Sequence, residues 1–464
     1  MLDPLILSRL QFAWVVAWHI VLPAFTVGLA SFIAFMEGRH LFTGNATYLR
    51  ISSFWTKIFA ISFGMGVVSG IVMPFQFGTN WSRFSDAAAN VVAPLLAYEG
   101  LTAFFLEASF LGVLLFGRNR VPPWVHFFAA LMVAIGTLSS SFWILATNSW
   151  MQTPAGYEII DGRFFVKDWF EVIFNPSFPY RLAHTVVAFY ITTGFVVLGV
   201  GAWLIRSGRA TGAERPMISM TLWFLLFLVP AQMVIGDQHG LNTLKYQPVK
   251  LAAIEARWDT ASRAPLTLFA LPDQARQTNH FNIEVPWLGS LILTHELDGT
   301  IRGLNEWPRD QQPPVAIPFF AFRIMVGAGL LMLTLVIAGN LLRIKGRLYG
   351  NRVFLIACQW AAPLGFVAVI AGWTTTEVGR QPWTVYGLLR TVDSVSPSLT
   401  GGNVLLSFVG YVIVYLIVFP SGALLMARVI RQGLNGGRNL EPVEGGTPQA
   451  PIAALAATLK EQRT

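Results

Sequence analysis

Nine apolar stretches of this 464-residue sequence are each long enough to cross about 30 Å of hydrocarbon as an α-helix. Hydrophobic residues make up 54% of the chain and charged residues only 12%, about half the charged share of an ordinary soluble domain. This composition excludes a soluble enzyme, a disordered chain and a secreted disulfide scaffold. We therefore predict an all-α polytopic membrane protein with about nine transmembrane helices. The predicted spans are residues 12–36, 54–76, 94–116, 124–148, 182–205, 217–236, 318–342, 353–375 and 403–427.

The sequence contains one cysteine, Cys358, within an apolar stretch. A single thiol excludes an intrachain disulfide, a four-thiolate iron–sulfur cluster and a Cys-x-x-Cys-His attachment site for covalent haem. Any redox cofactor must therefore be held without a thioether bond. We interpret Cys358 itself as a small buried apolar side chain.

Basic residues are distributed unevenly between the two sides of the predicted membrane domain. The connections on one side, together with the C-terminal segment, contain 17 lysines and arginines, and those on the other side contain seven when residues 237–316 are left out. The positive-inside rule then predicts an external N-terminus and a cytoplasmic C-terminus. The net charge of +8 forms no compact basic patch in the sequence, so we expect no nucleic-acid partner.

The predicted topology divides the chain into four parts. Residues 1–236 hold the first six helices, residues 317–432 hold the last three, and residues 433–464 are expected to be a mobile cytoplasmic tail. Residues 237–316 form an external loop much longer than a helix connection needs, and loops of this length are usually functional or disordered. Because a helix-like run at 251–258 and several Trp and Pro residues would order this loop, we predict a folded cap on the outer face.

Several ionisable or metal-binding side chains lie within or beside the apolar stretches, where an unpaired charge is costly. His and Met are the usual axial ligands of a low-spin haem. A single His near a helix end is more often interfacial than a ligand, and we interpret His126 in that way. Several candidates at one depth nevertheless favour a polar, haem-binding cluster in the outer half of the membrane. The candidates are His19, Glu99, Glu107, His184, Arg323, Met325 and Glu377.

Two of these carboxylates, Glu99 and Glu107, lie in the third span. On a regular helix Glu107 is about 12 Å deeper than Glu99 and about 80° around the axis. Together they could pass protons from mid-membrane to the outer half. These residues alone do not separate an oxidase from a transporter with buried carboxylates.

Six short motifs occur in an order that resembles subunit I of the cytochrome bd-type quinol oxidases. The resemblance covers nearly the whole chain, from LSRLQF at residues 7–12 to the ninth predicted span. The motifs are FQFGTNW (75–81), the stretch from Glu99 to Glu107, WILATNSWMQTP (143–154), KLAAIEARW (250–258), FAFRIMV (320–326) and GRQPW (379–383).

The resemblance implies ligands for three haems. His184 and Met325 match the axial ligands of the low-spin haem b, and Arg323 matches an arginine beside that haem, placed to offset propionate charge. His19 and Glu377 match ligands of the two high-spin haems, and which haem each one holds is left open. The cofactors implied are two haems b and one haem d.

Further positions match residues near the haems or in the reaction. Arg9 and Trp373 are implied haem contacts. The residues implied in oxygen reduction and the proton route are Glu99, Glu107, Ser140 and Arg380.

The long outer loop resembles the quinol-oxidising loop of the family. Lys250 and Glu255 match residues linked to quinol oxidation, and Asp237, at the predicted start of the loop, is a further candidate. Some members of the family have a long insertion in the second half of this loop. Here the chain passes directly from residues 304–314 to the seventh span, so it resembles the form with the short loop. TTTEVGRQPW resembles the cyanide-insensitive branch, in which another haem b can replace haem d.

The resemblance also implies partners, a location and a mechanism. We expect a second subunit as partner, with a small accessory subunit as a further candidate. We also expect the protein to be a multi-pass protein of the bacterial inner membrane. Ubiquinol or menaquinol would be oxidised at the outer face, and oxygen would be reduced to water with protons from the cytoplasm. Charge would then separate without a pumping step.

Two alternatives to this mechanism remain. A haem-binding electron-transfer subunit would have no need of His19 or Glu377. A secondary transporter should show repeated halves and broken helices near the midplane. The sequence shows neither of these transporter features.

Overall fold

The computed structural model describes residues 3–434 of the chain. Within these residues nine helical segments are long and apolar enough to cross a membrane, which confirms the predicted all-α polytopic fold. The predicted tail at 433–464 lies almost entirely outside the described residues. The nine segments are Pro4–Thr43, Ala46–Thr79, Ser82–Phe116, Pro123–Gln152, Phe178–Arg206, Glu214–Tyr246, Ala316–Ile344, Arg352–Val378 and Gly401–Gln432.

Two of the nine segments are interrupted at a proline. The first consists of α1 (Pro4–Val21) and α2 (Pro23–Thr43), and the eighth of α13 (Arg352–Ala361) and α14 (Leu364–Val378). Proline lacks the N–H that would continue the helical ladder. Leu22, between α1 and α2, keeps right-handed helical dihedrals, so the backbone is not unwound at this point. The sequence predicts residues 12–36 and 353–375 as single spans and does not indicate either interruption.

The third segment contains a π-helical turn. Between α4 (Ser82–Glu99) and α5 (Phe105–Phe116) lies η1 (Gly100–Phe104), which is π-helical. A π-helical turn is wider than an α-helical one and frequently occurs at functional sites. The angular offset between Glu99 and Glu107 that a regular helix predicts therefore does not apply here.

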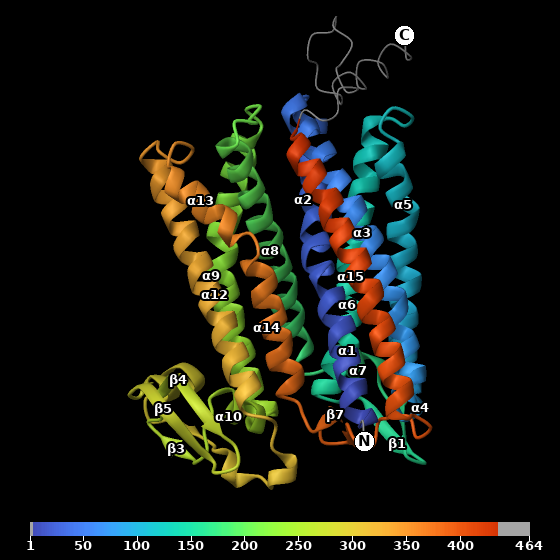
Figure 1. Cartoon of the computed structure of the whole chain (residues 1–464), viewed down its shortest axis with the longest axis vertical. Coiled ribbons are helices and arrows are strands. Elements are labelled where there is room, and N and C mark those ends of the chain that lie inside the picture. The colour runs from blue at the N-terminus through green and yellow to red at the C-terminus, as the bar shows by residue number, and fades with distance from the viewer. Residues whose placement is uncertain (1–2, 435–464) are drawn as a thin grey trace, which may run out of the picture.

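The helices stand in two groups, side by side (Figure 1). α8 (Phe178–Arg206) joins them, because Phe195 packs in the apolar core of one group and Val197 in that of the other. The group that includes α13 and α14 also contains α9 (Glu214–Tyr246) and α12 (Ala316–Ile344). The other group contains α1, α2, α4, α5, α3 (Ala46–Thr79), α6 (Pro123–Gln152) and α15 (Gly401–Gln432).

One end of the molecule, which we call the cap end, carries the strands and the start of α1 (Figure 1). The described strands form four separate antiparallel pairs, β1–β2, β3–β6, β4–β5 and β7–β8. Their bounds are Tyr157–Ile160, Arg163–Val166, Ala261–Ser262, Leu266–Asp273, Thr278–Val285, Thr300–Ile301, Trp383–Val385 and Leu389–Arg390 for β1 to β8. The short helices are α7 (Trp169–Ile173), α10 (Pro248–Ile254), α11 (Leu288–Thr294), η2 (Leu304–Glu306) and η3 (Arg309–Gln311).

The connection between α9 and α12 begins ten residues later than the predicted start at 237. α9 continues past Asp237 to Tyr246, so Asp237 is a helix residue. We use the name cap for residues 247–315, which contain α10, α11 and strands β3 to β6. The predicted helical run at 251–258 is helical only as far as Ile254.

Candidate functional site

Three of the four predicted haem ligands lie close to the cap end of their helices. His184 is six residues into α8, Met325 is nine residues into α12, and Glu377 is next to the last residue of α14. At 1.5 Å per residue they lie within about 14 Å of these helix ends. His19 is fifteen residues into α1, but it faces Gly70 of α3, which is nine residues, about 14 Å, from the cap-end terminus of that helix at Thr79.

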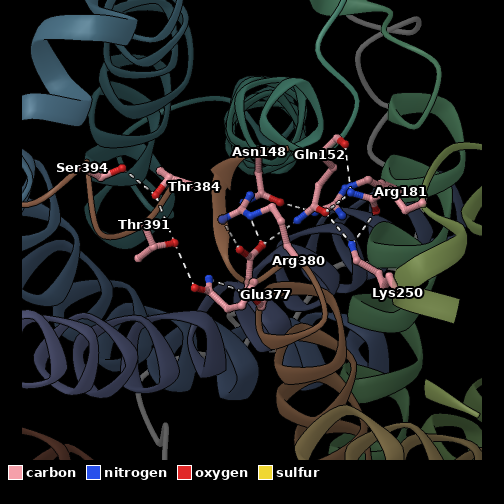
Figure 2. A network of polar contacts seen from close by, with 11 residues as sticks. Asn148, Gln152, Arg181, Lys250, Glu377, Arg380, Thr384, Thr391 and Ser394 are labelled. Carbon is pink, nitrogen blue, oxygen red and sulfur yellow. Dashed lines mark hydrogen bonds and ion pairs between the residues drawn. The ribbon is translucent and has the colours of Figure 1, made fainter. Parts of the chain in front are cut away.

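Glu377 lies at the centre of a largely buried polar network (Figure 2). Its Oε2 is 2.5 Å from Nη2 of Arg380. Its Oε1 accepts hydrogen bonds from Nδ2 of Asn148 at 3.0 Å and Nε2 of Gln152 at 3.4 Å. Both carboxylate oxygens are therefore held, one by α6 and the other by Arg380, two residues beyond the end of α14.

The same network contains Lys250, which the sequence places on an external loop. α10 instead buries this side chain, which is 4% exposed, and its Nζ donates at 2.5 Å to Oε1 of Gln152 and at 2.5 Å to Oε1 of Gln247. Burial, reinforced by Arg181 and Arg380, holds the pKa of Lys250 well below its ordinary value. Lys250 is thus joined to Glu377 through the single side chain of Gln152 (Figure 2).

The network holds more cationic groups than carboxylates. Arg181 donates to Oδ1 of Asn148, which places three basic side chains, Arg181, Lys250 and Arg380, around Glu377. Within the described part of the chain, Nε of Arg181 and both Nε and Nη1 of Arg380 are buried without a hydrogen-bond partner. Buried donors without partners are rare in folded proteins. The cluster therefore has the capacity to bind a further acidic group.

Arg323 attaches the cap to the membrane helices. Its guanidinium, on α12, lies 3.1 Å from Oε2 of Glu255 and donates at 2.8 Å to the carbonyl of Ile254 and at 3.0 Å to that of Thr267. Glu255 is 3% exposed, and burial raises its pKa, although Arg323 opposes this shift. The family resemblance implies a place for Arg323 beside a haem and gives no indication of this ion pair to the cap.

Replacing Arg323 with lysine is expected to loosen the cap at α10 and β4. Lysine keeps the charge but has no planar fork that can reach two carbonyls and a carboxylate at once. We expect a cost of about 1–3 kcal/mol in local stability. Hydrogen exchange of residues 250–270 should then be faster than in the wild type. Arg302→Lys, at an exposed ion pair with Glu306, is the control, and equal exchange in both variants would contradict this role.

The two candidate histidine ligands have different surroundings. Nδ1 of His19 lies 2.9 Å from Oγ of Ser69, which leaves its other ring nitrogen for a ligand. Nδ1 of His184 is buried without a hydrogen-bond partner within residues 3–434, and the ring of His239 lies 5.6 Å away between centroids.

The two carboxylates of the third segment lie on either side of the π-helical turn. Oε1 of Glu99 accepts a hydrogen bond from Oγ of Ser140 at 2.7 Å. Glu107 is 8% exposed and packs against α6 at Gly136. Both residues therefore face α6, which also supplies Asn148 and Gln152 nearer the cap end.

The remaining candidates lie apart from the Glu377 network. Asp237 is 3.0 Å from Nε2 of His295, so it contacts the cap from α9. Arg9 is exposed on α1, and Trp373 is half-buried on α14.

Sequence reasoning missed the amides and the arginine that complete the Glu377 network. Asn148 and Gln152 are four residues apart and so share one face of α6. Both lie within the motif at 143–154, where two polar side chains at this spacing near a span end were an available signal. Nothing in the sequence indicated that Arg181 and Gln247 would meet them.

A second buried ionic cluster lies at the end of the membrane domain opposite the cap. Glu37, 2% exposed, accepts hydrogen bonds from Arg118 and Ser52, and Nδ1 of His126 lies 3.3 Å from its Oε2. His126, which is 1% exposed, is the fourth residue of α6, so it lies near a helix end with its ring packed against Glu37.

The described chain matches one protein family over almost its whole length. Residues 7–434 match the family described as "Cytochrome bd terminal oxidase subunit I". The chain belongs to this family. It is a subunit of a haem-containing terminal quinol oxidase. This confirms the resemblance found in the sequence and contradicts the transporter alternative.

Two curated relatives and one solved structure agree with this assignment. "Cytochrome bd ubiquinol oxidase subunit 1" of Bacillus subtilis is 34% identical, covering 93% of this chain and 94% of the relative. "Cytochrome bd-II ubiquinol oxidase subunit 1" of Escherichia coli is 30% identical, covering 96% and 99%. A chain of bd oxidase from Geobacillus thermodenitrificans is 28% identical, with a TM-score of 0.86, covering 93% of this chain and 99% of that chain.

The residues of the site suit haem. His and Met side chains are usual axial ligands of haem iron, the carboxylate of Glu377 is a less usual one, and each candidate comes from a different helix. Haem also carries two propionate carboxylates, and the unpartnered N–H groups of Arg181 and Arg380 are suitable donors for such groups. The ligand side chains and the surplus of positive charge therefore both fit haem, the cofactor that the family implies.

Proposed function

We propose that quinol is oxidised where the cap meets α12, and that His184, Met325, His19 and Glu377 would hold the haems, which would supply the electron-transfer chemistry. The observation that supports this proposal is that polar contacts link the cap residues to the helices of the proposed ligands. Glu255 is ion-paired with Arg323, which lies two residues before Met325 on α12, and Lys250 is joined to Glu377 through Gln152. The residues matched to quinol oxidation thus contact the elements that carry two of the proposed ligands.

The cap residues would bind quinol and take up its protons. Glu255 has a raised pKa, so its carboxylate is a stronger base than an exposed glutamate and suits the role of proton acceptor. Lys250 has a lowered pKa, so a neutral amine can accept a hydrogen bond or a proton from a quinol hydroxyl. Protons accepted here would be released at the cap end, which positive-inside topology assigns to the outer face.

His184 and Met325 would hold a low-spin haem, and His19 and Glu377 the two high-spin haems. When bound, haem supplies the electron transfer and oxygen chemistry that amino-acid side chains lack. Arg181 and Arg380 would bind acidic groups of the cofactor beside Glu377. Two haems b with one haem d, or three haems b, match the branch that the TTTEVGRQPW sequence resembles.

Glu107 and Glu99, with Ser140, would carry protons from the cytoplasmic half of the membrane domain to the oxygen-reducing site. The hydrogen bond between Ser140 and Glu99 orients the second carboxylate of this route. Because quinol protons leave on the outer face while consumed protons enter from the cytoplasm, charge separates without a pump. We further propose a bacterial inner-membrane location and a second oxidase subunit as partner.

The test is a reduced-minus-oxidised spectrum of the purified protein, with haem extraction to identify the pigments. Haem b alone, with quinol oxidase activity, would support the branch without haem d. A chlorin band would establish haem d. Properly assembled protein with no haem would overturn the proposed ligand set.

A further inference from the structure

Three of the proposed axial ligands each contact a glycine on a neighbouring helix. A Cβ built on Gly372 of α14 would lie 2.8 Å from Sδ of Met325, on α12. A Cβ on Gly236 of α9 would lie 3.2 Å from Cε1 of His184, on α8. The same pattern occurs a third time, where Gly70 of α3 faces His19 of α1 at 3.1 Å. In each case the ligand occupies the space that a side chain would need.

We propose that Gly372, Gly236 and Gly70 are positioning residues, whose lack of a side chain sets where the ligand atoms of Met325, His184 and His19 lie. This inference rests on the proposed function, because it treats these three side chains as iron ligands. Gly372 is the sharpest case. A carbon–sulfur contact of 2.8 Å is far shorter than the 3.5–4.0 Å at which non-bonded carbon atoms attract, so one atom must move.

The flexible group at this contact is the methionine. Met has three rotatable side-chain bonds, whereas a Cβ on α14 is fixed by the helix backbone. An added methyl group at Gly372 would therefore displace Sδ of Met325 and leave the helices in place. The change should appear in the ligation of the low-spin haem and not in the folding of the protein.

Close helix packing is the competing explanation for these glycines, and the chain contains matched controls for it. Gly327 and Gly329 follow Met325 on α12 by two and four residues, and a Cβ on either would meet nothing within 4 Å among residues 3–434. Gly240, four residues from Gly236 on α9, is the matched control for Gly236, because a Cβ built there would also meet nothing within 4 Å among the described residues. Alanine is also a better helix former than glycine, so helix propensity alone does not predict a loss in any of these variants.

The experiment compares Gly372→Ala with Gly327→Ala in the purified oxidase. We expect Gly372→Ala to lose low-spin haem or hold it about tenfold less tightly, as for other residues that orient metal ligands. Any low-spin haem that remains should have a lower midpoint potential, because weaker Met ligation removes its raising effect. The high-spin haem absorption should persist and serves as the internal measure of assembly. Gly327→Ala should match the wild type in both signals.

Two further variants separate this inference from the ligand assignment. Met325→Leu should abolish the low-spin signal, and adding Gly372→Ala to Met325→Leu should then cause no further change. If Met325→Leu loses the signal while Gly372→Ala keeps it unaltered, the positioning role is overturned and the ligand assignment stands. If Met325→Leu keeps the signal, both are wrong. Loss of the high-spin absorption in Gly372→Ala would favour helix packing and overturn the inference.

Discussion

Replacing Glu377 with alanine is expected to release one high-spin haem and to destabilise the cap end of the membrane domain. The variant removes the only carboxylate that the structure places among Arg181, Lys250 and Arg380 in the drawn network (Figure 2). Removing one partner of a buried ion pair typically costs about 3–5 kcal/mol, because the other charge stays buried. Haem content and the thermal unfolding midpoint of the purified protein measure the two effects.

Two companion variants separate the charge of Glu377 from its shape. Glu377→Gln retains an oxygen that can accept from Asn148 and Gln152 but removes the negative charge, so we expect it to lie between wild type and alanine in stability. Glu158→Ala, on exposed β1 at the same end, is the surface control and should be neutral. A Glu377→Ala protein with the haem content and midpoint of the Glu158→Ala control would contradict the assignment.

The membrane fold could be predicted because hydropathy is a local property. Each predicted span lies inside one of the nine observed helical segments. The ends could not be predicted in the same way, since hydropathy detects contact with hydrocarbon and a helix can continue beyond it. α9 carries Asp237 and His239 within its last three turns for that reason. The π-helical turn at Gly100–Phe104 has no local sequence signal that we recognised.

The candidate site was predictable residue by residue but not as an arrangement. The motifs indicated Glu377, Lys250 and Glu255 as single positions on a span end and a loop. Lys250 and Glu377 come together through Gln152 of α6, and Glu255 is paired with Arg323 of α12, and no local pattern specifies either meeting. Lysine is almost never fully buried unless paired, so the burial of Lys250 could be inferred only once Gln152 and Gln247 were seen beside it.

Replacing Glu255 with glutamine is expected to lower quinol oxidation by about 10²–10⁴-fold, the usual contribution of a general base. The pH dependence gives the sharper result. Glu255 accepts a proton only when ionised, so kcat/KM for quinol should fall as the pH drops through its pKa. Because burial raises that pKa, the fall should begin at a higher pH than for an exposed glutamate. Steady-state quinol oxidation measured from pH 5 to pH 9 tests this.

The controls must account for Arg323, which Glu255→Gln leaves without an anionic partner. Glu255→Asp keeps the charge and should retain the acidic fall in rate, with its midpoint displaced, whereas Glu255→Gln should lose it. Glu296→Gln, at an exposed position in the same cap, should leave the profile unchanged. A Glu255→Gln enzyme that is slower but has the wild-type pH profile would show that the carboxylate only holds the cap in place through Arg323. The base that accepts the quinol proton would then have to be sought elsewhere, and the buried amine of Lys250 is the other candidate proposed in the cap.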